Sequence, residues 1–98
     1  MFNIGILTIN GFGLMSYASL IEPLRAANLL NEKPLYKIID ITVNKNFSIS
    51  SSGLEVRGTN FYEKEFNLDL LLVLSGGDPF LFNNKNVFNW LKRMIKFG

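Results

Sequence analysis

Residues 68–74 are apolar at every position except Asp69, and this run limits the possible folds more than any other feature of the sequence. A continuous apolar run of this length is typical of a β-strand that is covered on both faces. A second apolar run, residues 4–9, stops at Asn10-Gly11, as the first stops at Ser75-Gly76-Gly77. Strands of this kind occur mainly in parallel sheets with helices on both faces. The sequence therefore predicts an α/β fold with a mainly parallel sheet.

The remaining segments supply two helices and further strands. Apolar residues recur at helical spacing in two stretches, at Leu14, Tyr17, Ala18, Ile21 and Leu24 and at Val87, Phe88, Leu91, Met94 and Ile95. Alternating apolar residues predict a strand at residues 38–43. Ser51-Ser52-Gly53 predicts the turn of a hairpin within residues 47–57. Residues 61–66 are expected to form a loop with one helical turn.

Several residues are candidates for the ends of the two helices. Ser16 or Ser19 is expected to cap the first helix, and Asn84 the second. Pro23 lacks an N–H group and destabilises a helix interior by about 3 kcal/mol, so the first helix should begin late or kink there. Gly98 is expected to cap the C-terminus of the second helix.

The composition excludes several kinds of chemistry. The 98 residues contain neither Cys nor His, so this stretch has no cysteine nucleophile, disulfide or thiolate metal site, and lacks the commonest general base. The net charge is +2 and only Lys92, Arg93 and Lys96 are grouped, which does not indicate nucleic-acid binding by this segment. No apolar run approaches the roughly 18 residues of a membrane span. We expect a cytoplasmic protein without membrane contact, metal or cofactor.

The order of the predicted elements indicates an incomplete domain. The order is strand, helix, strand, hairpin, strand, helix, and in an α/β fold another strand should follow. Residues 68–74 need cover on both faces, and ending at residue 98 would leave apolar surface and an open sheet edge, which promote aggregation. We therefore expect residues 1–98 to be the N-terminal part of one domain. A small domain completed by dimerisation is the alternative.

Two glycine-containing turns form the candidate ligand site. Asn10-Gly11-Phe12-Gly13 follows the first apolar run, and Ser75-Gly76-Gly77-Asp78 follows the other. The carboxyl ends of parallel strands meet at one edge of the sheet, where α/β proteins bind ligands, and glycines let backbone N–H groups approach a ligand. The alternative for both is a plain turn that needs glycine for its backbone conformation. A dinucleotide site is disfavoured, because Ser16 stands where its fingerprint needs a third Gly or Ala.

Glu22, Arg25 and Trp90 each have a structural and a functional interpretation. Ser19 and Glu22 have the spacing of a capping box, whereas the functional alternative for Glu22 is a buried acid near the ligand site. Arg25 lies one turn after Glu22, which suits an ion pair on the helix surface. Trp90 borders the second apolar stripe and is interpreted as packing rather than binding. Without a His, Cys or Lys partner, Glu22 receives no catalytic role.

Several stretches resemble the start of GlxA-type transcription regulators, which join an amidase-like ThiJ/PfpI domain to a C-terminal AraC-type helix-turn-helix domain. The stretches that carry the resemblance are Gly11-Phe12, Ser16-Tyr17-Ala18-Ser19, Glu22-Pro23-Leu24-Arg25-Ala26-Ala27-Asn28, Ser51-Ser52-Gly53-Leu54, Ser75-Gly76-Gly77-Asp78-Pro79 and Trp90-Leu91-Lys92-Arg93. Residues 22–28 are the most specific part. The resemblance spans nearly all of the chain and implies a flavodoxin-like ThiJ/PfpI fold, of the class I glutamine amidotransferase-like type. Its C-terminal half and the helix-turn-helix domain would lie beyond residue 98.

The resemblance also implies sensing rather than catalysis. In the enzymes of this superfamily, an acidic residue just after the first strand supports a cysteine on a strand-to-helix elbow. The matching stretch here, Leu14-Met15-Ser16-Tyr17, contains no acid, and the elbow would follow residue 98. Without the acid, nothing tunes or positions the thiol. The resemblance therefore implies a pocket that binds a small nitrogenous effector, such as betaine, carnitine or arginine, between the Gly11 and Gly76 turns.

The site residues implied in this way form two groups. Ligand contact is expected at Gly11, Phe12, Gly76, Gly77 and Asp78, with supporting positions at Ser16, Glu22 and Arg25. The resemblance further implies a homodimer that changes state on binding effector, and DNA contact only through the absent domain. The alternative is a ThiJ/PfpI enzyme, such as a hydratase, deglycase or amidotransferase-like hydrolase, with its nucleophile beyond residue 98. A helix-turn-helix region downstream would support the regulator; Cys and His in a chain that stops after one complete domain would support the enzyme.

Overall fold

A four-stranded parallel sheet forms the centre of the computed structural model, which describes residues 1–63, 65–76 and 84–97. The strands lie in the order β5 (Thr59–Asn60), β2 (Tyr36–Thr42), β1 (Phe2–Thr8) and β6 (Leu70–Leu74), and each neighbouring pair is parallel. The predicted α/β fold with a mainly parallel sheet is therefore confirmed.

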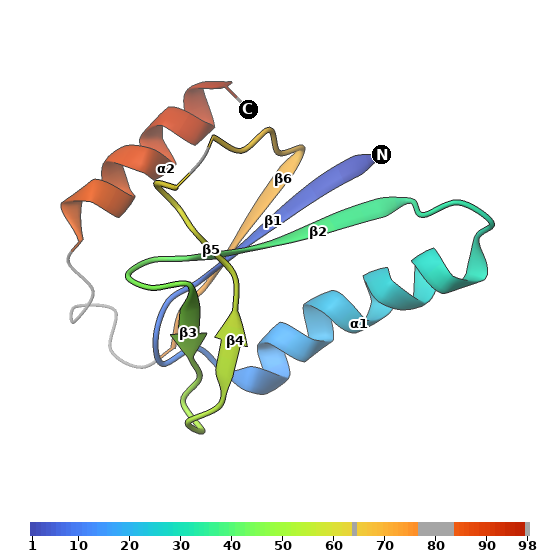
Figure 1. Cartoon of the computed structure of the whole chain (residues 1–98), viewed down its shortest axis with the longest axis horizontal. Coiled ribbons are helices and arrows are strands. Elements are labelled where there is room, and N and C mark those ends of the chain that lie inside the picture. Colours follow the sequence, from blue (N-terminus) through green and yellow to red (C-terminus); the bar gives the residue numbers. More distant parts are fainter. Residues whose placement is uncertain (64, 77–83, 98) are drawn as a thin grey trace.

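The other described elements are a hairpin and two helices. Strands β3 (Phe47–Ile49) and β4 (Glu55–Arg57) form an antiparallel pair outside the main sheet. Helices α1 (Leu14–Leu30) and α2 (Lys85–Phe97) lie on either side of the sheet in Figure 1. The hairpin was predicted correctly. The short strand β5 was not predicted, because two residues carry no detectable alternation.

Alternate residues of β2 show how the helices are placed. Ile41 belongs to a core cluster that includes Val87 and Trp90 of α2. Asp40, the preceding residue, instead accepts a hydrogen bond from the hydroxyl group of Tyr17 in α1. Because neighbouring residues of a strand point to opposite faces, α2 covers one face of the sheet and α1 covers the other.

Strand β1 is the central strand, as its apolar run predicts. Residues 4–8 are all buried, and the strand pairs with β2 on one side and β6 on the other. Gly5 lets the chain pack tightly here, since a Cβ atom at this position would lie 2.5 Å from the Leu68 side chain. The sheet is therefore best covered along β1, directly before the candidate site.

Strand β6 differs from its prediction in length and in cover. It begins at Leu70 rather than at residue 68, and it lies at an edge of the four-stranded sheet. Leu70 is 43% exposed and Val73 is 45% exposed, so the prediction that both faces are covered is wrong for the chain as described. Helix α1 packs against β2, and β1 lies between β2 and β6. The helix is therefore displaced from β6 and leaves Leu70 uncovered.

The first turn of α1 also differs from its prediction. Gly13 occupies the N-cap position and makes no side-chain hydrogen bond, so Ser16 and Ser19 lie within the helix. The interpretation of Ser19 and Glu22 as a capping box is therefore wrong. The helix continues through Pro23 and so does not begin late. Pro23 leaves the carbonyl of Ser19 without its usual donor, but Ser19 is exposed and water can bond to it.

Helix α1 covers the sheet only partly. Its predicted apolar stripe is half-buried, and no residue of the helix is fully buried. Met15, Leu29 and Leu30 are 82%, 72% and 87% exposed. Neither described helix combines the length and apolar character that a membrane-spanning helix needs.

Helix α2 packs more closely. Its start was predicted correctly, because the side-chain oxygen of Asn84 accepts hydrogen bonds from the backbone N–H groups of Asn86 and Val87, at 3.1 and 3.2 Å. Trp90 is buried in the core, as its packing interpretation predicts, whereas Phe88 is 40% exposed and does not belong to the buried stripe. The predicted cap at Gly98 falls outside the described residues.

Candidate functional site

The candidate site lies where β1 and β6 end side by side. Thr8 pairs with Leu74, and the N–H group of Ile9 extends the pairing by donating to the Leu74 carbonyl at 2.9 Å. Gly11 then turns the chain with φ +93°, a conformation that favours glycine. A Cβ atom on Gly76 would collide with the Gly11 carbonyl oxygen. The prediction that the two glycine turns converge is therefore confirmed.

The contact between the turns corrects one detail of the predicted pocket. The backbones of Gly11 and Gly76 touch, so a ligand has no room between them and would have to lie over both. The N–H groups of Gly11 and Phe12 donate to the carbonyls of Ile49 and Ile9. Backbone donors to a ligand would therefore come from the Gly76 side or from the first turn of α1, whose N–H groups have no acceptor within the helix. Gly77 and Asp78, also predicted to contact ligand, lie outside the described residues.

The β3–β4 hairpin packs directly on the first turn (Figure 1). The N–H group of Ile49 donates to the Asn10 side-chain oxygen at 2.9 Å, and the Gly11 N–H group donates back to the Ile49 carbonyl at 2.8 Å. The N–H group of Ser51 donates to the Phe12 carbonyl at 2.8 Å. Further along, the Ser48 hydroxyl group donates to the carbonyl of Thr8, at 2.9 Å. The hairpin is thus a wall of the candidate site.

Phe12 supports the turn from inside. Its side chain is fully buried, and its ring meets that of Tyr17 edge-on, with centroids 6.0 Å apart. In the described structure the ring offers no surface to a ligand. Its predicted role in binding is therefore limited to holding the turn in place.

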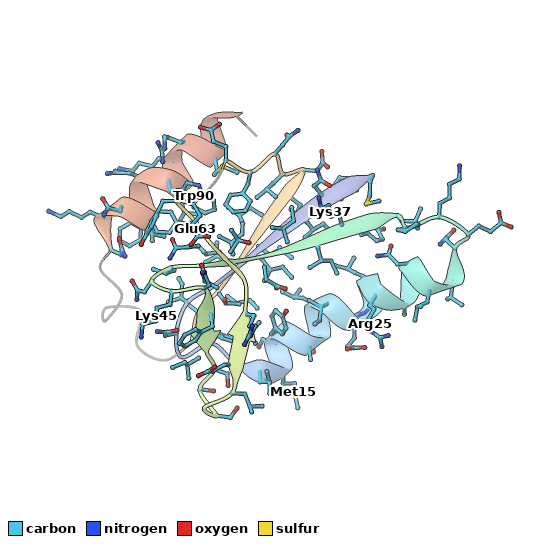
Figure 2. The ribbon with its side chains drawn as sticks, in the orientation of Figure 1. Met15, Arg25, Lys37, Lys45, Glu63 and Trp90 are labelled. Atoms are coloured by element: carbon cyan, nitrogen blue, oxygen red, sulfur yellow. The ribbon has the colours of Figure 1, made fainter. Side chains whose placement is uncertain are left out.

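The three supporting positions on α1 separate into two places. The Ser16 hydroxyl group lies beside Gly13, in the turn of the helix nearest the site. Glu22 and Arg25 form an ion pair at 2.6 Å, and their side chains are 55% and 60% exposed. Figure 2 shows Arg25 on the outer side of α1. The predicted ion pair is confirmed, and Glu22 is not a buried acid. Its carboxylate lies about two helical turns beyond Ser16 along α1.

A hydrogen bond between α1 and β2 was not predicted from the sequence. The hydroxyl group of Tyr17 donates to an Asp40 carboxylate oxygen at 2.8 Å. Burial raises the pKa of Asp40, and the hydrogen bond from Tyr17 partly opposes this rise. Burial, followed by the hydrogen bond to Asp40, also raises the pKa of Tyr17. The signal available in the sequence was Asp40 itself, a single acidic residue within the mainly apolar residues of β2.

The amino-acid sequence of the chain is similar to sequences of known transcriptional regulators. No protein-family model matches the chain. The HTH-type transcriptional regulator GlxA of Rhizobium meliloti is 43% identical over 76 residues, which cover 78% of this chain and 24% of that protein. The chain is homologous to GlxA-type transcriptional regulators.

Further relatives of the same kind agree with GlxA. The HTH-type transcriptional regulator CdhR of Pseudomonas aeruginosa is 28% identical over 92 residues, which cover 94% of this chain and 27% of that protein. GbdR of the same species is 31% identical over 74 residues, which cover 76% of this chain and 20% of that protein. The chain thus spans a quarter or less of two of these HTH-type transcriptional regulators and 27% of the third.

A solved structure shows the same fold. The crystal structure of an AraC family transcriptional regulator from Pseudomonas putida superimposes with a TM-score of 0.82 at 20% identity. The match covers 98% of this chain and 51% of that one. The fold described above therefore recurs in a solved AraC family protein.

The described residues offer little chemistry at the glycine turns. The first turn of α1 contains no acidic residue, and the sequence contains neither Cys nor His. Among the residues that the structure describes, no cluster of carboxylates is suited to hold a metal ion. Among the described residues, the site presents main chain, the hydroxyl group of Ser16 and the hairpin wall. Such a surface can bind a ligand through hydrogen bonds and shape.

Proposed function

We propose that this chain is the effector-sensing part of a GlxA-type transcriptional regulator, with the fold of an amidase-like ThiJ/PfpI domain. Homology to HTH-type regulators supports the regulatory role. A parallel sheet covered by one helix on each face is compatible with the flavodoxin-like ThiJ/PfpI fold. In this proposal, DNA contact is made by a separate helix-turn-helix domain, and the sensing domain acts as a homodimer.

The observation that carries the proposal is the joined glycine corner, Gly11 against Gly76, walled by the β3–β4 hairpin. It lies at the carboxyl ends of two neighbouring parallel strands, the usual place for ligands in α/β proteins. The first turn of α1 supplies no acid, and the sequence has no thiol or imidazole, so binding without reaction is the simplest use of the corner. The effector that we propose is a small nitrogenous metabolite, a quaternary amine or arginine.

Calorimetric titration with glycine betaine, carnitine and arginine tests this proposal. Gly76→Ala should weaken binding about tenfold or more, because the added Cβ atom meets the Gly11 carbonyl and must open the corner. Gly53→Ala is the matched control. Gly53 also has a positive φ, but it lies at the hairpin tip with no atom within 4 Å of the added Cβ. That control should cause backbone strain without loss of binding.

Three results would contradict parts of the proposal. Equal effector affinity in Gly76→Ala and in the unsubstituted chain, with unchanged circular dichroism, would place the effector site elsewhere. Absence of heat with all three compounds would exclude these effector classes. Conversion of a bound compound to product by a longer form of the protein would favour the ThiJ/PfpI enzyme.

A further inference from the structure

A second concave surface lies away from the glycine corner, between helix α2 and the turn that follows β5. It is an open groove with a volume of about 610 Å³, within the range of small-ligand and peptide sites. The residues that line it are Phe61, Tyr62, Asn86, Asn89, Lys92 and Arg93. We call this surface the α2 groove. Figure 2 shows the adjoining region of α2 near its labelled residue Trp90.

The floor of the α2 groove is aromatic. Phe61 is buried, and its ring packs edge-on against the buried ring of Trp90, with centroids 5.8 Å apart. Tyr62 stacks edge-on against Phe61 at 4.7 Å and is itself 67% exposed. The groove therefore has a fixed base with one aromatic side chain that is available to a ligand.

The rim of the α2 groove carries positive charge. Lys92 and Arg93 line one end, and none of the described residues that line the groove carries a carboxylate. Among the described residues, neither cation has a carboxylate within ion-pair distance; the ion pair found there joins Arg25 to Glu22. Glu63, which follows Tyr62, forms no ion pair with either cation, so the rim can attract a further anionic group.

The other end of the α2 groove carries amides. Asn86 and Asn89 lie one turn apart on α2. Each side-chain amide has both a hydrogen-bond donor and an acceptor, so it can pair with the C=O and N–H groups of a peptide main chain. Asn86 and Arg93 are seven residues apart, about 10 Å along the helix axis. An extended peptide covers that length with about three residues.

We propose that the α2 groove binds an extended acidic peptide segment. The amides of Asn86 and Asn89 pair with its main chain, and Lys92 and Arg93 pair with its carboxylates through charge-assisted hydrogen bonds. A lone small anion would use only the cationic end. A DNA duplex presents about six phosphate charges over the same length, against two cations. This site does not depend on effector binding at the glycine corner.

Fluorescence of Trp90 tests the proposal, since it is the one tryptophan of the chain and contacts the groove lining through Phe61. The probe is terminally blocked hexaglutamate, added to the 98-residue chain at low salt. We expect a saturable change that weakens as the salt concentration rises. Blocked hexaglutamine should cause no change.

Matched variants locate the site. Lys92→Gln with Arg93→Gln should raise the dissociation constant for hexaglutamate about tenfold. Lys33→Gln with Lys37→Gln removes the same net charge from exposed positions remote from the groove lining, and should leave the dissociation constant nearly unchanged. All four side chains are exposed, so neither double variant should disturb folding.

Several outcomes would overturn the proposal. An equal loss of affinity in both double variants would show that hexaglutamate binding depends on the net charge of the chain and not on the α2 groove. Inorganic phosphate displacing the peptide at equal concentration would indicate a small-anion site, and tighter binding of a DNA duplex would indicate a nucleic-acid surface. If the fluorescence stays constant, the side-chain amide signals of Asn86 and Asn89 are followed by NMR; constancy of both readouts excludes binding in the groove.

Discussion

At the scale of single residues, the pair of Tyr17 and Asp40 is the most informative contact in the molecule. It joins α1 to β2 by a side-chain hydrogen bond of 2.8 Å, and the Asp40 carboxylate is partly buried. Burial disfavours the charged form, and a hydrogen bond from the hydroxyl group favours it. The ionisation of Asp40 is therefore linked to folding.

Asp40→Asn should show this link through the pH dependence of stability. The raised pKa means that the folded protein holds the proton on Asp40 more tightly than the unfolded chain does. The stability of the unsubstituted chain therefore falls as pH rises from the ordinary aspartate pKa to the raised value. Asn cannot ionise and still accepts from Tyr17, so the variant should gain relative stability over that interval. Urea unfolding at about pH 3 and about pH 7 measures the difference.

Tyr17→Phe tests the other half of the pair. Loss of the hydroxyl group leaves the charged Asp40 without its donor, so the variant should be about 1 kcal/mol less stable at neutral pH and less affected in acid. Tyr62→Phe, at an exposed tyrosine, is the control and should be neutral. A loss in Tyr17→Phe that stays the same at both pH values would contradict a charge effect.

At the scale of elements, Asn28 joins the end of α1 to the start of β2. Its side-chain oxygen accepts from the N–H groups of Leu35 and Tyr36, both at 2.9 Å. Its amide nitrogen donates to the Tyr36 carbonyl at 2.8 Å. The loop between the two elements is therefore closed by one side chain. Asn28 ends the Glu-Pro-Leu-Arg-Ala-Ala-Asn run, and its three hydrogen bonds give that run a structural use.

Asn28→Ala should destabilise the chain by about 2 kcal/mol, because two backbone donors and one acceptor lose their partner. Asn31→Ala is the matched control, since Asn31 is exposed and makes a single bond to the carbonyl of Ala27. Urea unfolding of both variants measures the contrast. Equal losses of stability in the two variants would mean that both asparagines act by terminating α1 rather than by closing the loop.

The fold could be predicted where local chemistry decides it. The apolar runs, the Ser51-Ser52-Gly53 turn and the Asn84 cap carry their signals within a few residues, and the structure has all three. The capping box at Ser19 and Glu22 failed, because its four-residue pattern does not say where a helix begins. Here the backbone at Gly13 sets the start instead.

The candidate site was predictable only in its backbone. Convergence of Gly11 and Gly76 follows from parallel pairing, which brings strand ends together. The contact of Tyr17 with Asp40 joins residues 23 positions apart, and no local pattern encodes it. The docking of the hairpin through Asn10 is a contact of the same long-range kind. The α2 groove likewise depends on how the Tyr62 turn meets a helix distant in sequence.

At the scale of the whole molecule, the sheet ends in an exposed strand. Strand β6 has a partner on one side, and Leu70 and Val73 are partly exposed on its two faces. Unpaired strand edges with apolar side chains pair readily with other chains. Aggregation therefore remains a prediction, and we expect it to occur through the exposed edge of β6.

Val73→Lys should reduce aggregation of the chain, because a charged side chain on an edge strand opposes strand pairing. Leu29→Lys removes an apolar side chain of α1 that is more exposed, 72% against 45% for Val73, but lies away from the edge, and it should still help less. Light scattering at a series of protein concentrations compares them. Equal effects would implicate exposed apolar surface in general. A sharp melting transition of the unsubstituted chain, independent of concentration, would contradict aggregation altogether.

The collision that any side chain on Gly76 would cause has a consequence for how such proteins diversify. The base of the corner must stay bare main chain, so it cannot itself be altered to suit a new ligand. Discrimination between chemically similar molecules has to be encoded in the surrounding segments, among them the serine-rich hairpin tip at residues 50–52. Exchanging this hairpin between homologous regulators should therefore transfer ligand preference while leaving the corner untouched.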